Sequence, residues 1–276
     1  MDQPTQSRLP SHFEEIDHLP LGKVTGDFLP RSAFLALCKM WLHSAEFQHI
    51  VTLNPEMVVE AESDDEFCKA VQRADIRIPD GAGLIWAQWY IRSEFWALFP
   101  SLLAFSFRHV ERIPGVEVVY ALADMCADEG LPLYLLGGTA AQVEGARRRL
   151  QKKFPGLHVF VSPEHTFDVA GPPEIIRDIQ GHGPAVLLVA YGAPKQTLWI
   201  ERHRQDLPTV RIAVGVGGAF AILSEEKRRA PRWMRHLNVE WLWRLLLEPS
   251  RFPRIWQAVV KFPQLIRRQK IHTYSH

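Results

Sequence analysis

The chain has little cysteine and lacks the common motifs of metal and nucleophile chemistry. It contains no Asp-x-Asp pair, no His-Glu-x-x-His motif and no cysteine cluster, which are frequent ligand sets for Mg²⁺, Mn²⁺ or Zn²⁺. A Gly-x-Ser-x-Gly elbow and a Gly-x-Gly-x-x-Gly dinucleotide fingerprint are also absent. We therefore expect no metal cofactor, and we expect helix dipoles, Lys and Arg to neutralise any diphosphate leaving group.

The cysteine content favours a reducing compartment. The three thiols form no Cys-x-x-Cys pair and cannot all pair with one another, so burial is their expected role. They are Cys38, Cys68 and Cys126.

Long apolar runs are missing as well. The most apolar stretch, residues 84–107, is interrupted by Arg92 and Glu94 and broken by Pro100, so no run reaches the ~20 residues that a spanning helix needs. The stretch fits equally a membrane-facing or partner-facing surface and a buried pair of helices. We expect no signal peptide, because residues 1–20 are polar and acidic, and we predict that they are disordered.

Beyond residue 48, short apolar runs alternate with helical patterns. Strands are predicted at 49–52, 76–78, 133–136, 158–161, 185–190 and 210–214. Helices are predicted at 55–73 (with a Ser63-x-x-Glu66 capping box inside it), 116–129, 139–154, 172–180 and 194–204. Such alternation indicates an α/β fold with a parallel sheet that helices cover on both faces.

The last fifty residues differ from the rest in charge and composition. From Lys227 onward, twelve Lys and Arg face only Glu240 and Glu248, so this part carries +10 and the remainder −9. We therefore divide the chain into a tail at 1–20, an α/β core at 21–227 and a basic, Trp- and Arg-rich helical appendage at 228–276. A basic appendage on an acidic body indicates binding to anionic lipid or phosphate, although an ordinary amphipathic helix with a basic outer face is the plainer alternative.

Two strand-to-helix junctions carry polar side chains. Thr52 and Asn54 follow the first strand, and Asp80 follows the second within Pro79-Asp80-Gly81. Because parallel strands end at one edge of the sheet, these groups should meet where ligands bind in such folds. An acid beside an anion-binding helix start suggests a base that acts on a phosphorylated substrate. Taken alone, however, Asp80 reads more readily as a turn residue that caps a helix.

Three further strand exits are rich in glycine, which lets a backbone approach a phosphate. Each alone fits a structural turn or a solvated helix start. Lys195 and Gln196, at the start of the next helix, could contact a phosphate and a sugar or base. The candidates at these exits are Gly137, Gly138, Tyr191, Gly192, Lys195, Gly217 and Gly218.

In this order, the segments resemble the WecG/TagA/CpsF glycosyltransferases (glycosyltransferase family 26). The resemblance runs from about residue 50 to residue 256. Its markers are Thr52-x-Asn54, Ala74-Asp75, Pro79-Asp80-Gly81-x-Gly83, Arg112-x-Pro-Gly115, Leu136-Gly137-Gly138, Phe154-Pro155-Gly156, Gly192-x-Pro194-Lys195-Gln196, Arg229-Ala-Pro231, Glu240-Trp241, Arg244 and Pro249-x-Arg251.

The resemblance implies a Rossmann-like, inverting and metal-independent enzyme. It would move a sugar from a UDP-sugar to a polyprenyl-diphosphate-linked saccharide at the cytoplasmic face of a bacterial membrane. Asp80 falls on the family's proposed base, and Thr52, Asn54, Arg112 and Gln196 fall on positions implicated in binding or catalysis. Arg244, Arg251 and Arg254 fall on appendage arginines thought to reach the acceptor diphosphate. An anionic membrane surface is an implied partner, a homo-oligomer stays open, and no nucleic acid is expected.

The chain departs from the family pattern at Ala221, at Thr197, at a common glycine that is replaced within Ser224-Glu-Glu-Lys227, and in a longer aromatic stretch after Asp80. Ala221 follows Phe220 where an acid is usual, and Thr197 follows Gln196 where Glu is usual. These departures fit a changed donor sugar or oligomer contact, or a loss of activity, against which the retained Asp80 and arginines argue. Two other classes stay open: a different nucleotide-dependent α/β enzyme such as a dehydrogenase, and a non-catalytic membrane scaffold for polysaccharide assembly. The residues do not identify the donor sugar.

Overall fold

A computed structural model provides the three-dimensional structure of the protein. It describes residues 16–93, 113–163, 173–227, 230–231, 233–234, 237 and 239–274. All three cysteines are buried thiols, as expected.

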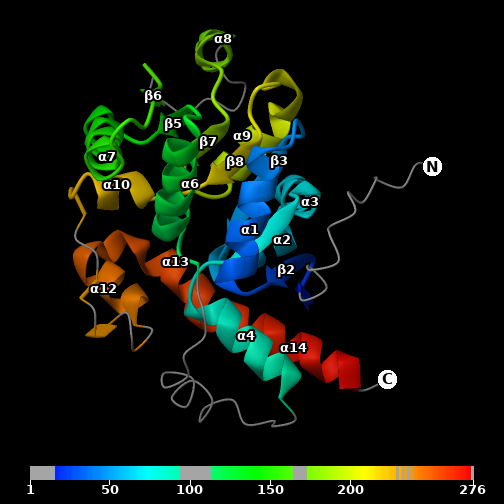
Figure 1. Ribbon diagram of the computed structural model, residues 1–276. Coiled ribbons are helices and arrows are strands. Elements are labelled where there is room, and N and C mark those ends of the chain that lie inside the picture. The colour runs from blue at the N-terminus through cyan, green and yellow to red at the C-terminus, as the bar shows by residue number, and fades with distance from the viewer. Residues whose placement is uncertain are drawn as a thin grey trace.

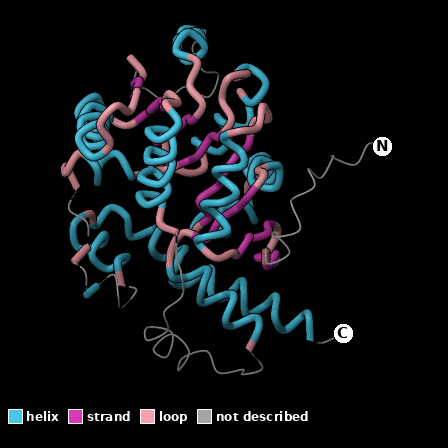
Figure 2. The backbone as a smooth tube through the Cα atoms, viewed as in Figure 1, coloured by secondary structure: helices cyan, strands magenta, loops and turns pink. Residues whose placement is uncertain are grey.

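A six-stranded parallel sheet forms the centre of the molecule (Figures 1 and 2). Its strands lie in the order β4-β3-β8-β7-β5-β6, and each neighbouring pair is parallel. The bounds are β3 (Gln48–Leu53), β4 (Ile76–Pro79), β5 (Leu133–Gly137), β6 (Val159–Val161), β7 (Val186–Ala190) and β8 (Ile212–Gly215). The predicted Rossmann-like α/β architecture is therefore confirmed, and each predicted strand is present.

Alternate side chains of these strands enter opposite layers of the core. Ile50, Leu135 and Val214 lie in one buried cluster, whereas their neighbours Val51 and Leu136 lie in clusters on the other face. Successive strand residues point to opposite faces, so a strand covered on both sides must be apolar throughout. This requirement explains the unbroken apolar runs in the sequence.

Helices cover both faces of the sheet. The face seen at the front of Figure 1 packs against α1 (Arg31–Leu42), α6 (Gly115–Glu129), α7 (Ala140–Lys153) and α10 (Ala219–Leu223). The other face packs against α2 (Pro55–Ser63), α3 (Asp65–Arg73), α4 (Ala82–Arg92), α8 (Pro173–His182) and α9 (Lys195–Arg202), the last followed by the short η2 (Arg204–Asp206). The helices after β3 and β8 thus leave to opposite faces.

The predicted helix over 55–73 is two helices. Asp64 adopts an extended conformation, ends α2 and accepts a hydrogen bond from the Phe67 amide (2.9 Å), which makes it the N-cap of α3. The expected capping box that starts at Ser63 is therefore wrong, because the Ser63 hydroxyl instead donates to the Glu60 carbonyl (3.2 Å). The neighbouring aspartate wins because it has the extended backbone that a cap requires.

An N-terminal hairpin precedes the sheet. It consists of β1 (Asp17–Leu21) and β2 (Val24–Phe28), which pair antiparallel. Strand β1 thus starts inside the segment predicted to be disordered, while residues 1–15 of that segment lie outside the described residues. Asp27 anchors the hairpin to the sheet, because its buried carboxylate pairs with Arg77 of β4 at 2.8 Å.

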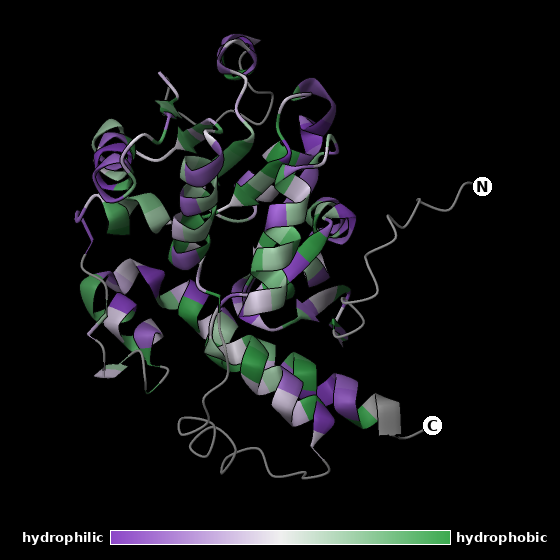
Figure 3. Cartoon of the chain, viewed as in Figure 1, coloured by the Kyte–Doolittle hydropathy of each residue, from purple (hydrophilic) through white to green (hydrophobic). Residues whose placement is uncertain are grey.

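The C-terminal region is a chain of short helices that ends in one longer helix. The elements are α12 (Glu240–Leu247), η3 (Pro249–Arg251), α13 (Phe252–Trp256), the π-helical η4 (Gln257–Lys261) and α14 (Phe262–Tyr274). Helix α14 runs beside α4, and hydrophobic residues mark the zone where they meet (Figure 3). Within the described part of the chain, no helix combines the length and the apolar character needed to cross a bilayer.

Candidate active site

The predicted junctions meet at the carboxyl edge of the sheet. Along this edge the exits follow in the order Asp80 after β4, Asn54 after β3, Gly217 after β8, Gly192 after β7 and Gly138 after β5. In open α/β sheets, ligands bind outside the carboxyl ends of strands whose following helices leave to opposite faces. Strands β3 and β8 meet this condition, and Asp80 is one strand away.

Asp80 lies between the ends of three elements. Its amide donates to the Leu53 carbonyl of β3 at 2.6 Å. A Cβ placed on Gly115, the first residue of α6, would lie 3.9 Å from Asp80 Oδ2 and 3.8 Å from the Val216 carbonyl oxygen. These distances place the Asp80 carboxylate beside the positive end of α6 and the exit of β8. The carboxylate is half-buried, so it can meet a ligand.

Thr52 and Asn54 hold the backbone around this carboxylate. The buried Thr52 hydroxyl donates to the Gly215 carbonyl of β8 at 2.8 Å. The Asn54 carboxamide oxygen caps α2 by accepting from the Met57 amide at 3.0 Å. Thr52 therefore ties β3 to β8, and Asn54 fixes the direction in which α2 leaves the edge.

Gln196 is buried in the first turn of α9. Its Oε1 accepts from the Gly192 amide at 3.1 Å and from the Gly217 amide at 2.9 Å. The side chain therefore joins the exit loops of β7 and β8. Gln196 was predicted to contact the substrate. In the structure its side-chain oxygen instead accepts hydrogen bonds from two backbone amides.

Glycine-rich exits bring the backbone to this edge. Gly137 and Gly138 have φ values of +88° and +77°, which L side chains rarely adopt. The Tyr191 ring lies against Gly137, where an added Cβ would stand 2.8 Å from its Cδ1 atom. Lys195 is exposed at the start of α9. Gly137, Gly138, Tyr191 and Lys195 therefore belong to strand exits at this edge, where backbone amides could approach a diphosphate.

The predicted arginines belong to other segments of the chain than the strand exits at this edge. Arg112 lies outside the described residues. Arg244 and Arg254 are exposed on α12 and α13. The three appendage arginines do not lie on one continuous helix, because α12 ends at Leu247 and Arg251 belongs to η3.

Arg251 takes part in an ion-pair cluster that joins the appendage to the core. Glu248 forms an ion pair with Arg251 and another with Lys227, the last residue of the core, at 2.6 Å. The hydrogen bonds from Arg251 and then from Lys227 lower the pKa of the Glu248 carboxyl to about 2.

One contact at the site was not predicted. Phe262 of α14 is buried, and a Cβ placed on Gly83 would lie 3.8 Å from its ring and 2.6 Å from Pro55. The appendage therefore packs onto the first turn of α4, three residues after Asp80. The helical spacing of Ile255, Phe262 and Ile266, all buried, was the available signal in the sequence.

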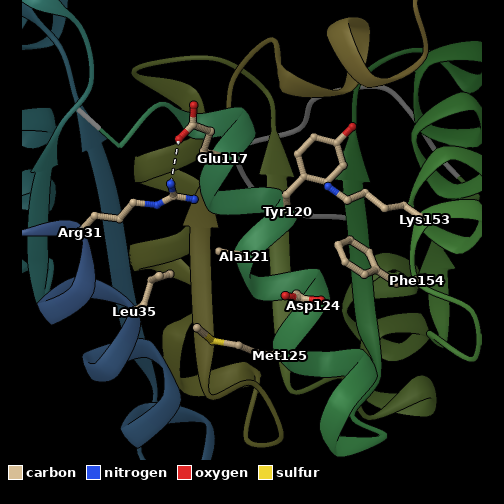
Figure 4. A pocket seen from close by; sticks show the side chains of 9 residues that line it. All are labelled: Arg31, Leu35, Glu117, Tyr120, Ala121, Asp124, Met125, Lys153 and Phe154. Carbon is tan, nitrogen blue, oxygen red and sulfur yellow. Dashed lines mark ion pairs between the residues drawn. The ribbon is translucent and has the colours of Figure 1, made fainter. Parts of the chain in front are cut away.

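A hollow among the described residues lies away from this edge. It has a volume of about 470 Å³ and lies between α1, α6 and the end of α7 (Figure 4). In this hollow, Arg31 and Glu117 form an ion pair at 3.9 Å. The Lys153 amine lies 4.2 Å from the centre of the Tyr120 ring. None of the predicted site residues lines this hollow.

Comparison with known proteins gives one family. The model of the Glycosyl transferase WecG/TagA/CpsF family matches residues 21–276. Relatives from Staphylococcus aureus strains NCTC 8325 / PS 47, COL and MRSA252 are each 27% identical over 206 residues, which cover 75% of this chain and 74% of the relative. Each of these relatives is named N-acetylglucosaminyldiphosphoundecaprenol N-acetyl-beta-D-mannosaminyltransferase.

Proposed function

Because the chain belongs to the WecG/TagA/CpsF glycosyltransferase family, we propose that it moves a sugar from a UDP-sugar to a polyprenyl-diphosphate-linked saccharide that serves a bacterial surface polymer. The observation that carries the proposal is the position of Asp80 beside Gly115 and Val216, on the same sheet edge as the glycine-rich exits. The relatives' name adds an acceptor with N-acetylglucosamine on diphosphoundecaprenol and a transferred N-acetylmannosamine. These are the first substrates to test.

The reaction is a single displacement with inversion. Asp80 removes the proton from the acceptor hydroxyl while that oxygen attacks the anomeric carbon and the bond to UDP breaks. An α-linked donor would then give a β-linked product, which agrees with the β configuration in the relatives' name. The half-buried carboxylate at this edge suits the role because the Asp80 amide is bonded to the Leu53 carbonyl while the side chain stays reachable.

The departing UDP receives its stabilisation from protein groups. Backbone N–H groups of the glycine-rich exits and the exposed Lys195 can surround a diphosphate, and the family resemblance adds Arg112. No metal is needed in this scheme, because fixed donors neutralise the developing charge. The activity should therefore survive an excess of EDTA.

The appendage brings the acceptor to the site. Large exposed hydrophobic side chains of the described residues gather in one region, between residues 233 and 271. They are Trp233, Leu237, Trp241, Leu242, Leu246, Leu247, Phe252, Trp256, Val259 and Ile271. Arginines lie among them, and this mixture suits the interface of an anionic membrane. We assign Arg244, Arg251 and Arg254 to the acceptor diphosphate and the enzyme to the inner membrane face.

A donor screen tests the proposal. The full chain would be incubated with UDP-N-acetylmannosamine, its uronic acid, UDP-glucose or UDP-glucuronate and an N-acetylglucosaminyl polyprenyl diphosphate, in vesicles that contain anionic lipid. Mass and anomeric configuration of the product are then measured. We expect one donor to give an inverted product. Retention of configuration would contradict the displacement, and vesicle binding without any transfer would support a scaffold instead.

A further inference from the structure

The carboxamide oxygen of Gln196 connects the glycine-containing exit loops of β7 and β8. Gly192 and Gly217 both have left-handed backbones, with φ of +76° and +51°, and no atom lies within 4 Å of the place where either would carry a Cβ. Their amides donate to Gln196 Oε1 at 3.1 and 2.9 Å. Open glycine loops depend on such hydrogen bonds because side-chain packing is missing there.

The carboxamide oxygen has no spare capacity for a substrate. An amide oxygen offers two lone pairs, and the two glycine amides use both. The side chain is only 4% exposed. The oxygen therefore acts on a ligand only through the loops that it holds.

The other side of the carboxamide rests on β8. A Cβ placed on Gly215 would lie 2.6 Å from Gln196 Nε2 and 2.8 Å from its Cδ. The carbonyl of the same Gly215 accepts the Thr52 hydroxyl at 2.8 Å. Thr52 and Gln196 therefore both contact Gly215 of β8. These contacts connect β3, β8 and the exit of β7.

We propose that Gln196 is a positioning residue that holds the exit loops of β7 and β8 at the separation required by the diphosphate of a nucleotide-sugar donor. The inference rests on the proposed function for the identity of the ligand. Glycine-loop amides bind phosphate only when they converge, and a displacement of about 1 Å can cost on the order of a hundredfold in rate.

Two variants test this role by different routes. Gln196→Met removes the acceptor oxygen, and Gly215→Ala displaces an unaltered Gln196. Both should raise the KM for the UDP-sugar about 10- to 100-fold and lower kcat far less, since Asp80 stays in place. The helical Gly181, with no atom within 4 Å of its added Cβ, gives the matched control Gly181→Ala, which should leave KM unchanged. A normal KM in Gly215→Ala would overturn the proposal, because a displaced Gln196 would then leave donor binding unaffected.

Amide hydrogen exchange in the ligand-free enzyme supplies a readout that is independent of activity. The Gly192 and Gly217 amides should exchange about tenfold faster in Gln196→Met, while the Leu135 amide in β5 stays protected and reports intact folding. Gln196→Glu should keep both amides slow, because a carboxylate also accepts them and is favoured in the first turn of a helix. Unchanged exchange of both glycines in a folded Gln196→Met variant would overturn the proposal, even if no UDP-sugar were ever a substrate.

Discussion

At the scale of single residues, Gly81 gives the backbone directly after Asp80 an unusual conformation. Its backbone has φ +103° and ψ 157°, a combination that is almost restricted to glycine. No atom lies within 4 Å of an added Cβ, so any effect of a side chain there comes from the backbone alone. The residue therefore allows a test of position without a new contact.

We predict that Gly81→Ala lowers both stability and turnover. The strained backbone should cost about 1–3 kcal/mol of unfolding free energy, and relaxation of the loop should move Asp80 and lower kcat. Gly181→Ala is again the control, since helix α8 should gain about 0.5–1 kcal/mol from alanine. Chemical denaturation and steady-state kinetics measure the two effects. Wild-type kcat in Gly81→Ala would show that the loop conformation does not position the acid.

The sequence predicts the gathering of polar residues at the sheet edge, because parallel strands end together. It does not reveal that Thr52 and Gln196 face inward. The partner of Thr52 is Gly215, 163 residues away in the chain, and the β3–β8 pairing that joins them is non-local. Whether a hydroxyl meets a ligand or a neighbouring carbonyl depends on that pairing, which local patterns do not contain.

At the scale of elements, the appendage has two parts with different surfaces. Helix α14 is packed onto the core. Phe262 is fully buried, and its ring lies edge-on to the Trp86 ring with 6.4 Å between the ring centres. The Lys270 amine caps α4 by donating to the carbonyls of Tyr90 and Ser93, at 2.6 and 2.5 Å. Its burial lowers the pKa of Lys270. Helices α12 and α13 instead present exposed apolar side chains.

Substitution of one phenylalanine in each part distinguishes the two parts experimentally. Phe262→Ala should lower the unfolding free energy by about 3–5 kcal/mol, because it leaves a cavity between α14 and α4. Phe252, which is 57% exposed, is the matched residue. Phe252→Ala should change stability by less than about 0.5 kcal/mol and weaken binding to anionic vesicles up to about tenfold. Equal loss of stability in both variants would contradict the two-part description.

The ion pairs of Glu248 give a pH dependence. Its folded pKa of about 2 lies below the ordinary 4.5, so its contribution to stability is present above pH 4.5 and is lost as pH falls towards 2. Glu248→Gln should therefore destabilise the protein at pH 7, by about 1 kcal/mol or less because the pair is partly solvated, and have no effect near pH 2. Thermal unfolding at several pH values measures the difference, with Glu240→Gln as the charge control. A difference that is constant with pH would contradict the assignment.

Element boundaries follow from local chemistry only in part. Thr139 was predicted to start a helix and is indeed the N-cap of α7, with Gln142 completing a capping box. At residues 63–66 two caps competed, and the sequence alone did not show that Asp64 would take the extended conformation. The packing of α14 on α4 could not be predicted from local patterns, since it joins residues about 180 positions apart.

At the scale of the whole molecule, the two ends of the described chain meet. Gln269 of α14 donates to the Pro20 carbonyl at 2.8 Å and accepts from the Gly22 amide at 2.9 Å in the N-terminal hairpin. The same helix touches α4 close to Asp80 through Phe262. In our proposal this arrangement holds the membrane-binding part of the appendage near the carboxyl edge of the sheet, so that a lipid-linked acceptor and a soluble donor can meet there.

The turnover of Asp80→Asn tests the central claim most directly. The exchange keeps the shape of the side chain and removes its ability to take a proton. With UDP-sugar and lipid-linked acceptor at saturation, we predict a loss of kcat of about 10²–10⁴-fold, with an unchanged melting temperature and unchanged binding to anionic vesicles. A folded Asp80→Asn variant that turns over at nearly the wild-type rate would contradict the assignment of Asp80 as the base.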